Sequence, residues 1–402
     1  MRLLLSATAV LVASTLARAG GPPPRLTQPG WLPANARALE RLIAERGRSS
    51  ATWDAHHRPV ATFDWDNTMM RQDVGDLMLA DALRRGTLRA PPGGQWSAVY
   101  AALSAAAQQS LARACGAAAE RDGRLRTDKV PACADEILAV ALDGRTRGGE
   151  PAYATPDTDA LHHPYAFSAK VFWGQRHADV RAQAAAAHRA AENAPVGATM
   201  KVGSREAPAW VRIYPAMREL VAVLQAEGFD VWIVSASLQA AVEAVAADVG
   251  IAADHVVGVR LQAERDGRLL PRLESCGGAV DAVMTWGTGK RCHIQRAILG
   301  APPAMQLQPS AGAQRVALAA GDTDGDVAML QDAELRLVIN RQKPAVLCRA
   351  LANRDGRWLV QPMFLDPLPP RAEPYACAGV PDADGKPLPD VAEVVEPQRR
   401  VE

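Results

Sequence analysis

Residues 60–68 read VATFDWDNT, a short apolar run that ends in two carboxylates and a polar turn. The apolar part has the length and composition of a buried β-strand. Asp64 and Asp66 stand at positions i and i+2 where this strand would end. Two carboxylates in this arrangement suit a nucleophile paired with a general acid and base. The alternative is a solvated turn with an Asx cap, because Asp and Asn also favour turns.

The rest of the chain predicts the sheet to which this strand belongs. Residues 73–145 are Ala-rich and mostly helical in pattern, whereas from residue 211 helices alternate with short Val, Ile and Leu strands. Such alternation is typical of a parallel sheet with helices on both faces. We therefore expect an α/β fold, a doubly wound parallel sheet of Rossmann type with a mainly helical cap inserted after the first core strand. The further strands are expected at 229–234, 255–262, 315–320 and 335–339, with a hairpin near 264–270 and a helix at 238–249.

The same patterns predict how the chain is organised. The expected parts are a signal peptide (1–19), an N-terminal segment with the first core strand (20–72), a helical cap (73–210), a core domain (211–365) and a Pro-rich tail (366–402). The tail lacks periodicity, so we expect it to pack loosely on the surface.

The charge balance and the N-terminal segment limit which partners and which cellular location can be expected. Lys plus Arg number 45 and Asp plus Glu 44, so a broad basic face for nucleic acid or a membrane surface is not expected. Residues 1–19 combine one early Arg, an apolar run and a final Ala-Arg-Ala, which is the pattern of a cleaved signal peptide. No other stretch is long and apolar enough to span a membrane. We expect an exported protein, periplasmic or secreted, that acts on a small molecule.

Because export would place the protein in an oxidising compartment, the number and spacing of its cysteines can be interpreted. The six cysteines are Cys115, Cys133, Cys276, Cys292, Cys348 and Cys377. An even number in an oxidising compartment indicates disulfides. A C-x-x-C motif is absent from the sequence, which disfavours a zinc ribbon or a thioredoxin-like site. Pairing of nearest neighbours closes short loops and is our expectation, although six cysteines allow many other connectivities.

Further polar groups stand where ligands bind in open α/β sheets, at the carboxyl ends of strands. Ser235 closes an apolar strand, where its hydroxyl can hold a phosphate oxygen or cap the next helix. Lys290 opens a helix after a Gly-rich turn, which suits an anion site, although an isolated lysine is usually a surface residue. Residues 321–326, GDTDGD, offer the oxygen ligands that Mg²⁺ prefers, or form a plain acidic turn.

In this order, the four clusters resemble the motifs of the haloacid dehalogenase-like (HAD) phosphatases. The matches are D-x-D-x-T at 64–68, an apolar strand ending at Ser235, the helix-opening Lys290, and G-D-x-x-x-D at 321–326. The resemblance implies that Asp64 attacks phosphorus and forms an aspartyl-phosphate, and that Asp66 protonates the leaving oxygen and then activates water. An acid at position 66 also favours a phosphatase over a dehalogenase.

The resemblance implies a ligand set as well. The residues implied in phosphate binding are Thr68, Ser235 and Lys290, and those implied in holding Mg²⁺ are Asp64, Asp66 (through its backbone carbonyl), Asp322 and Asp326. Phosphoserine phosphatases usually carry Asn just before the last Asp, where this chain has Gly325. Asp324 therefore remains an alternative to Asp326 as support for the metal.

The position of the cap resembles that of the phosphoserine phosphatase-like branch, in which an acid nine residues after the nucleophile binds the amino group of the substrate. Asp73 stands there, although an acid at a helix N-terminus is also favoured by the helix dipole. Residues 153–173 are rich in aromatic residues, including Tyr165 and Trp173. Aromatic faces recognise quaternary ammonium groups, but they also pack a cap onto its core.

The signal peptide, the D-x-D-N-T motif and the large cap with its cysteines together resemble the secreted bacterial phosphorylcholine phosphatases. The expected function is an exported, Mg²⁺-dependent phosphomonoesterase that forms an aspartyl-phosphate and acts on phosphocholine or phosphoethanolamine. A broad-specificity or phosphoserine-type exported phosphatase is the first alternative. A non-catalytic binding protein with the same fold is the second.

Overall fold

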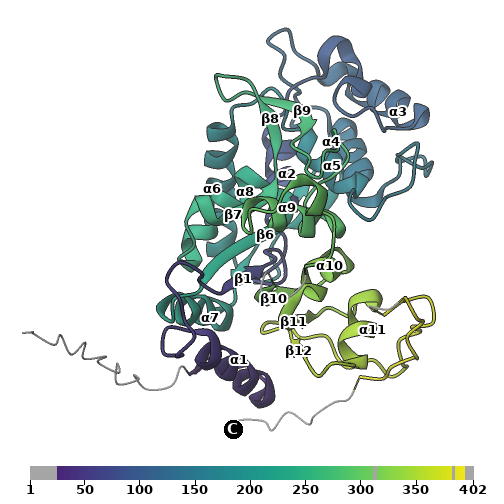
Figure 1. Cartoon of the computed structure of the whole chain (residues 1–402). Coiled ribbons are helices and arrows are strands. Elements are labelled where there is room, and N and C mark those ends of the chain that lie inside the picture. Colours follow the sequence, from purple (N-terminus) through teal and green to yellow (C-terminus); the bar gives the residue numbers. More distant parts are fainter. Residues whose placement is uncertain (1–24, 311–314, 383–384, 394–402) are drawn as a thin grey trace, which may run out of the picture.

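The computed structural model describes residues 25–310, 315–382 and 385–393 (Figure 1). The expected signal peptide lies outside these residues. The strands are β1 (Val60–Phe63), β2 (Met70–Arg71), β3 (Thr199–Val202), β4 (Arg205–Pro208), β5 (Arg212–Ile213), β6 (Asp230–Leu238), β7 (Val256–Val259), β8 (Leu261–Ala263), β9 (Leu269–Leu273), β10 (Val316–Gly321), β11 (Ala333–Asn340) and β12 (Trp358–Pro362).

Helices account for most of the remaining regular structure. The α-helices are α1 (Pro33–Arg46), α2 (Val74–Arg85), α3 (Ala105–Cys115), α4 (Pro131–Leu138), α5 (His163–Lys170), α6 (His177–Asn193), α7 (Pro215–Ala226), α8 (Gln239–Glu243), α9 (Thr288–Ala297), α10 (Val327–Gln331) and α11 (Pro344–Ala352). The short 3₁₀ segment η5 (Ala246–Val249) follows α8.

Within the described residues, the central sheet has six strands in the order β12-β11-β10-β1-β6-β7. All neighbouring pairs are parallel. Their carboxyl ends therefore share one edge, and β1 lies where the chain order changes direction. The register pairs Phe63 with both Ala320 and Ile233, so the residues that follow these strands come close together.

Each face of the sheet has its own apolar core. On β11, Leu337 and Ile339 belong to the larger core cluster, which includes residues of α1 and α7, whereas Val338 belongs to a second cluster with residues of α9, α10 and α11. Alternate side chains thus point to opposite faces, as the pleat requires. The expected doubly wound parallel sheet, covered on both faces, is confirmed.

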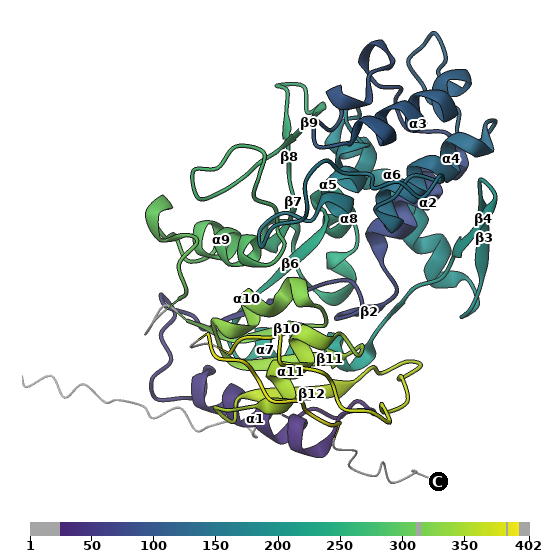
Figure 2. The same cartoon turned by 90° about the vertical axis from the view of Figure 1, so that its right-hand side faces the viewer.

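The long connection between β1 and β6 carries helices α2 to α6, which we call the helical insertion. It occupies the upper part of both views, whereas α10, α11 and β12 lie in the lower part (Figures 1 and 2). Helix α5 lies within the stretch 153–173 that is rich in aromatic residues. Among the described residues, no helix combines the length and apolar character needed to cross a membrane.

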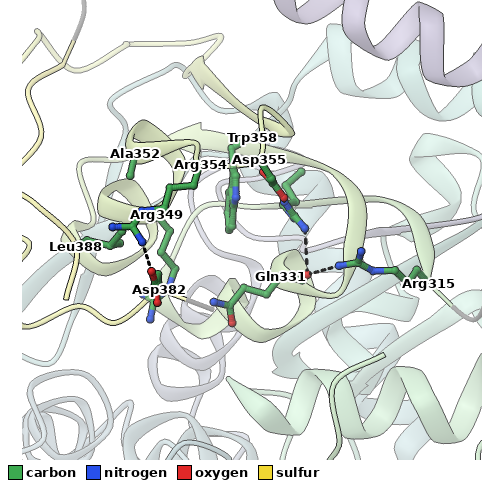
Figure 3. Close-up of a pocket in the computed structure, with 10 residues that line it drawn as sticks. Arg315, Gln331, Arg349, Ala352, Arg354, Asp355, Trp358, Asp382 and Leu388 are labelled. Carbon is green, nitrogen blue, oxygen red and sulfur yellow. Dashed lines mark hydrogen bonds and ion pairs between the residues drawn. The ribbon is translucent and has the colours of Figure 1, made fainter. Parts of the chain in front are cut away.

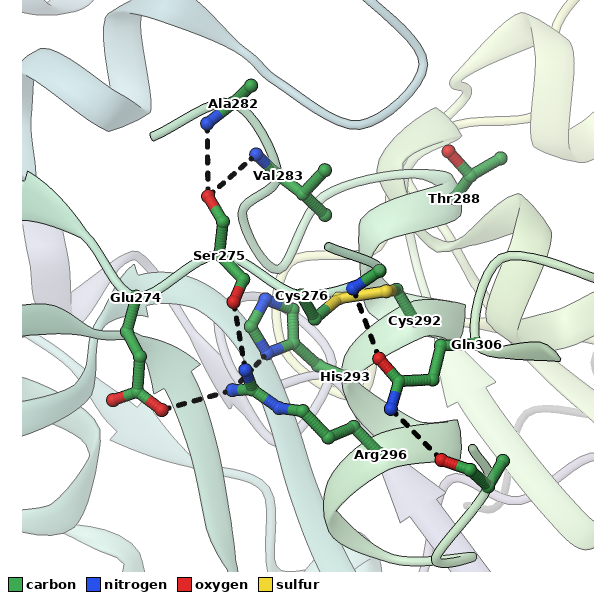
Figure 4. Close-up of a disulfide and its surroundings, with 12 residues drawn as sticks. Glu274, Ser275, Cys276, Ala282, Val283, Thr288, Cys292, His293, Arg296 and Gln306 are labelled. Carbon is green, nitrogen blue, oxygen red and sulfur yellow. Dashed lines mark hydrogen bonds and ion pairs between the residues drawn. A yellow bond between two sulfur atoms is a disulfide. The ribbon is translucent and has the colours of Figure 1, made fainter. Parts of the chain in front are cut away.

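The structure contains disulfides between nearest-neighbour cysteines, as expected. The pairs are Cys115–Cys133, Cys276–Cys292 and Cys348–Cys377. The first joins α3 to α4. The second ties the segment after β9 to α9, beside His293 and Gln306 (Figure 4). The third ties the tail to α11.

Three local expectations were wrong. The helix expected at 238–249 is divided into α8 and η5, although Val242, Val245 and Val249 are all buried. Apolar residues at helical spacing indicate that one face of a segment is buried, but they do not require that segment to be one continuous helix. The expectation of a loosely packed tail fails because Tyr375, Cys377 and Leu388 are buried in the second core. Strand β12 was not foreseen.

Candidate active site

Four strand ends and one helix start converge on a small cavity at the carboxyl edge of the sheet. The backbone N–H of Asp64 donates to the carbonyl oxygen of Ala320 at 2.9 Å, which places the first motif against the end of β10. The residues that line this cavity of about 40 Å³ are Asp64, Asp66, Asn67, Asp73, Tyr165, Ala236, Ser237, Trp286, Lys290, Asp322, Thr323 and Arg341. Residues that are more than 250 positions apart in the sequence thus meet at one place.

Lys290 lies between two carboxylates. Its Nζ is 2.6 Å from Asp64 Oδ1 and 2.6 Å from Asp326 Oδ1, and its side chain is 1% exposed. The two carboxylates raise the pKa of Lys290 against the opposing effect of burial, so the ammonium stays charged. The alternative interpretation, that Lys290 is an ordinary surface residue, is therefore wrong. A buried cation next to Asp64 offsets part of the charge of that carboxylate.

Asp326 organises the loop after β10. Its Oδ2 accepts hydrogen bonds from the backbone N–H groups of Asp322 (3.0 Å) and Thr323 (2.9 Å) and from Thr323 Oγ1 (3.1 Å). A Cβ on Gly321 would lie 2.5–2.8 Å from the Asp326 side chain, so glycine permits this close approach. Asp326 therefore shapes the loop that presents Asp322.

Asp322 is held by two partners from distant parts of the chain. Thr68 Oγ1 donates to its Oδ1 at 3.0 Å, and Arg341 Nη1 donates to its Oδ2 at 2.7 Å. Burial, followed by the charge of Asp326, raises the pKa of Asp322, while Arg341 acts in the opposite direction. These contacts fix the orientation of the carboxylate beside Asp64.

Asp66 points toward the side of the cavity formed by α2 and β6. Its Oδ2 accepts from Ser237 Oγ at 2.6 Å, and its Oδ1 accepts from the backbone N–H of Val74 at 2.6 Å. Burial, together with the charges of Asp73 and Asp64, raises the pKa of Asp66 well above its usual range. A carboxyl group with a raised pKa can carry a proton near neutral pH, as a general acid must.

The carboxylates beside Lys290 have the composition of a site for a hard cation. One carboxylate oxygen from each of Asp64, Asp322 and Asp326 lies within 4.8 Å of the others, and all three residues are buried. Burial raises the pKa of Asp64 well above its usual range, and the neighbouring charges of Asp326 and Asp322 add to this. Concentrated negative charge with oxygen ligands suits Mg²⁺. The residues present therefore fit the expected metal.

Asp324 points away from this cluster. Its Oδ1 accepts from the backbone N–H of Val346 at 3.0 Å, at the start of α11. The side chain thus satisfies a free N–H group at a helix N-terminus, a common role for aspartate. Of the two candidates for metal support, Asp326 is the one that lies beside Asp64 and Asp322.

Two of the expected phosphate-binding hydroxyls lie behind the cavity wall. Thr68 is fully buried and bonded to Asp322, and Ser235 is fully buried with its Oγ accepting from the backbone N–H of Ser237 at 3.1 Å. Ala236 and Ser237, which follow Ser235, line the cavity in its place. Lys290 is the expected phosphate-binding residue that lines it directly.

A second small cavity continues from the first, between α2 and α5. Its lining includes Asp73, Asp76, Tyr165, Ser168 and Ser237. Asp73 caps α2, since its Oδ1 accepts from the backbone N–H of Asp76 at 2.9 Å, and it also lines both cavities. Asp73 therefore caps α2 and also lines both cavities, so its position fits both interpretations.

The aromatic residues at 165–173 divide into two groups. Tyr165 lines both cavities, and its ring centroid is 5.4 Å from that of Trp286. Phe167 and Phe172 are buried in the core, and Trp173 lies outside the described lining of either cavity. Only Tyr165 of these aromatic side chains is placed to touch a ligand.

Sequence reasoning missed several lining residues, among them Ser237, Arg341, Asp76 and Trp286. Arg341 directly follows β11, so the rule that ligands bind at the carboxyl ends of strands applies to it as well. Asp76 stands one helical turn after Asp73 on the same helix. Trp286 carries no recognisable local signal, because its position depends on how its turn packs against the loop after β10.

A larger cavity lies elsewhere, at the amino ends of β11 and β12 (Figure 3). It has a volume of about 290 Å³ and is lined by arginines, Trp358 and part of the tail. Its two carboxylates are already engaged, Asp355 with Arg336 and Asp382 with Arg354. Among the residues that the structure describes, its lining holds no carboxylate cluster like the one at the other edge of the sheet.

Comparisons with known proteins agree with this geometry. Residues 144–331 match the model of the haloacid dehalogenase-like hydrolase family. A search of the curated proteins finds no match. A conserved, functionally unknown protein from Anaerococcus prevotii is similar in structure, with 19% identity and a TM-score of 0.56 over 83% of this chain and 93% of that one.

Two other solved structures align with lower scores. A protein of unknown function from Bordetella pertussis Tohama I has 17% identity and a TM-score of 0.44 over 76% of this chain and 99% of that one. A substrate-bound phosphoserine phosphatase has 12% identity and a TM-score of 0.31 over 70% and 86%. The parallel sheet, its carboxylate-bearing edge and the match over residues 144–331 lead to one conclusion: the chain has the fold of the haloacid dehalogenase-like hydrolases.

Proposed function

We propose that the chain is a Mg²⁺-dependent phosphomonoesterase that works through an aspartyl-phosphate and prefers small cationic substrates, phosphocholine or phosphoethanolamine. The observation that carries the proposal is the placement of Asp64. It lies in a cavity, 2.6 Å from a buried lysine, with Asp66 and Asp322 on the same lining. Phosphoryl transfer depends chiefly on such positioning and charge neutralisation.

In the first step, a carboxylate oxygen of Asp64 attacks phosphorus and the bond from phosphorus to the leaving-group oxygen breaks. Asp66 donates its proton to that oxygen, so the alcohol leaves neutral. Its raised pKa keeps this proton available, and Ser237 and the N–H of Val74 hold the carboxyl group in place. Lys290 stays charged and balances the negative charge that gathers around Asp64.

In the second step, Asp66, now a carboxylate, removes a proton from water. The water oxygen attacks phosphorus, and the bond between phosphorus and Asp64 breaks. Inorganic phosphate leaves, and both aspartates return to their starting states. One residue serves as acid and then as base, so the site needs no further proton donor.

Asp64, Asp322 and the backbone carbonyl of Asp66 would hold Mg²⁺. When bound, the ion neutralises phosphate charge and orients it for in-line attack. Thr68 and Arg341 keep Asp322 in the position required for this. Asp326 supports the arrangement through the loop that it closes.

The substrate preference rests on the second cavity. Asp73 and Asp76 line this cavity, Tyr165 lines both cavities, and Trp286 lines the first. Burial raises the pKa of both carboxyl groups, and a cationic head group would favour their charged forms. A carboxylate and an aromatic face are the groups that recognise an ammonium or quaternary ammonium head. Asp73, Tyr165 and Trp286 line the same cavity as Asp64, so the leaving group of a substrate bound at Asp64 would lie against them.

The test is phosphate release by residues 20–402 with Mg²⁺, comparing phosphocholine, phosphoethanolamine, phosphoserine and p-nitrophenyl phosphate at matched concentration. We expect kcat/KM for an amino-alcohol phosphate to exceed that for p-nitrophenyl phosphate about tenfold or more, equivalent to about 1.4 kcal/mol. Asp73→Asn should reduce turnover of the cationic substrates more than that of p-nitrophenyl phosphate.

Other outcomes would separate the parts of this proposal. A flat substrate profile with normal turnover would favour a broad-specificity phosphatase, and a preference for phosphoserine would favour a phosphoserine-type enzyme. Equal losses on all substrates in Asp73→Asn would make Asp73 a helix cap only. No release from any substrate would favour a binding protein. The export part of the proposal is tested separately, by locating the protein in fractionated cells.

A further inference from the structure

Three side chains that the proposed reaction does not use lie together where α6 meets η5. They are His188 and Glu192 of α6 and Asp248 of η5, and one possible ligand atom from each lies within 4.8 Å of the others. We propose that these residues form a second divalent-metal site, of the zinc type, that joins the helical insertion to the core.

The sequence places two of the ligands on one helical face. His188 and Glu192 are four residues apart in α6, so their side chains project side by side. Asp248 comes from the segment that follows β6 and α8, which belongs to the core side of the junction. Helix α6 is already paired to this region, because His177 Nε2 is 2.7 Å from Glu243 Oε2 of α8.

The environment of His188 is a second, independent observation that supports a metal site. Its side chain is 1% exposed, and within the described part of the chain neither ring nitrogen makes a hydrogen bond. Its Nε2 instead faces Asp248 Oδ2 at 3.4 Å. A buried polar ring without hydrogen bonds is unfavourable, and a metal ion at Nε2 would satisfy it.

An ion pair with Asp248 is the competing account of this contact. At 3.4 Å, however, the contact is longer than the roughly 2.7–2.9 Å of a charge-assisted hydrogen bond between an imidazolium and a carboxylate. The neutral ring is the form that binds metals. The contact is therefore better suited to a shared cation than to a direct ion pair.

The donor set indicates which ion fits. One imidazole nitrogen and two carboxylates are typical zinc ligands, and three protein ligands leave the fourth position for water. Mg²⁺ and Ca²⁺ prefer sites built from oxygen alone. The side chain of Asp248 is 44% exposed, so an ion reaches the site from solvent. This site thus differs in chemistry from the all-carboxylate cluster at Asp64.

The experiment measures Zn²⁺ uptake by the full-length mature protein in buffer with millimolar Mg²⁺, by equilibrium dialysis and metal analysis. The variants are Glu192→Gln, Asp248→Asn and their combination, which change accessible side chains. The double variant should retain one equivalent of Zn²⁺ less than the wild type, and each single variant should bind that ion about tenfold more weakly or worse. Any Zn²⁺ bound by the carboxylate cluster at Asp64 should be the same in the wild type and the variants, so it does not affect the difference in Zn²⁺ content between them.

Thermal unfolding supplies a second readout, because an ion that binds only the folded state raises Tm. Zn²⁺ should raise Tm of the wild type more than that of the double variant. Co²⁺ should give the visible absorption of a nitrogen- and oxygen-ligated centre in the wild type, and this signal should be lost in the double variant.

Glu243→Gln is the matched control. It breaks the other pair between α6 and the core, so it should lower stability slightly and leave the extra equivalent of Zn²⁺ in place. Equal zinc uptake and equal Tm shifts in wild type and double variant would overturn the proposal. So would loss of the extra equivalent in Glu243→Gln, because the effect would then reflect helix docking and not ligation.

Discussion

A Cβ atom on Gly325 would lie 2.4 Å from Cζ3 of Trp286. The ring of Trp286 therefore occupies the space where a larger residue at position 325 would stand. The backbone N–H of Gly287 also donates to the carbonyl oxygen of Gly325 at 2.8 Å. The turn that precedes Lys290 is thus packed directly on the loop that carries Asp322 and Asp326. Glycine at position 325 therefore leaves room for this ring.

Gly325→Ala should disturb both loops at once. Forcing a methyl group into this contact should destabilise the protein by about 1–3 kcal/mol and lower kcat, because Lys290 and Asp322 would shift relative to Asp64. Urea unfolding and phosphate release measure the two effects. Adding Trp286→Ala should recover much of the lost stability. Gly116→Ala is the control, since nothing lies within 4 Å of a Cβ there. Unchanged stability and turnover in Gly325→Ala would show that the contact is not tight.

Asp64→Asn tests the nucleophile. The amide keeps the shape of the side chain but is a far poorer nucleophile, so turnover should fall about a thousandfold or more. Tm should change little, because Lys290 retains its contact with Asp326. The exposed Asp54→Asn is the control for an asparagine substitution and should keep full activity. Activity near that of the wild type in Asp64→Asn would remove this residue from its proposed role.

Metal dependence is tested by chelation and by two variants of one loop. EDTA should abolish phosphate release, and added Mg²⁺ should restore it. Asp322→Asn should raise the Mg²⁺ concentration needed for half-maximal activity by about tenfold or more. Asp324→Asn keeps an oxygen acceptor for the N–H group at the start of α11, so it should leave both stability and the Mg²⁺ requirement nearly unchanged. The reverse pattern would make Asp324 the metal-supporting residue.

The stability of the protein should fall in acid because of His293, which lies beside Cys292 and contacts Arg296 (Figure 4). Burial, followed by the charge of Arg296, lowers the pKa of His293 to about 3. The unfolded chain takes up this proton near pH 6.5, whereas the folded chain does so only near its lower pKa. This contribution is therefore fully present above pH 6.5 and is lost as the pH falls toward 3.

At pH 4.5 the loss from this residue should be about 3 kcal/mol. Urea unfolding at pH 7.5 and pH 4.5 measures it. His293→Gln should be less stable at pH 7.5 but should lose less stability on acidification than the wild type. The exposed His57→Gln should behave like the wild type at both values. A parallel pH dependence in wild type and His293→Gln would assign the acid sensitivity to other groups.

Much of the fold follows from local patterns. The apolar strands, the helices between them and the break after β1 were visible as periodicity, because a residue buried on a sheet or helix face must be apolar wherever it occurs. The nearest-neighbour disulfides followed from short loops. Strand β12 was missed because its residues, VQP among them, carry weak strand propensity and are held by pairing with β11.

Local sequence patterns show which groups stand at the strand ends, and parallel topology brings such ends to one edge. Asp64, Lys290 and Asp322 could therefore be named before their contacts were known. Four contacts could not be foreseen: Arg341 with Asp322, Asp324 with α11, Trp286 with Gly325, and His188 with Asp248. The reason is physical: spacing along a strand sets the direction of a side chain, whereas its partner across the fold depends on how separate elements pack.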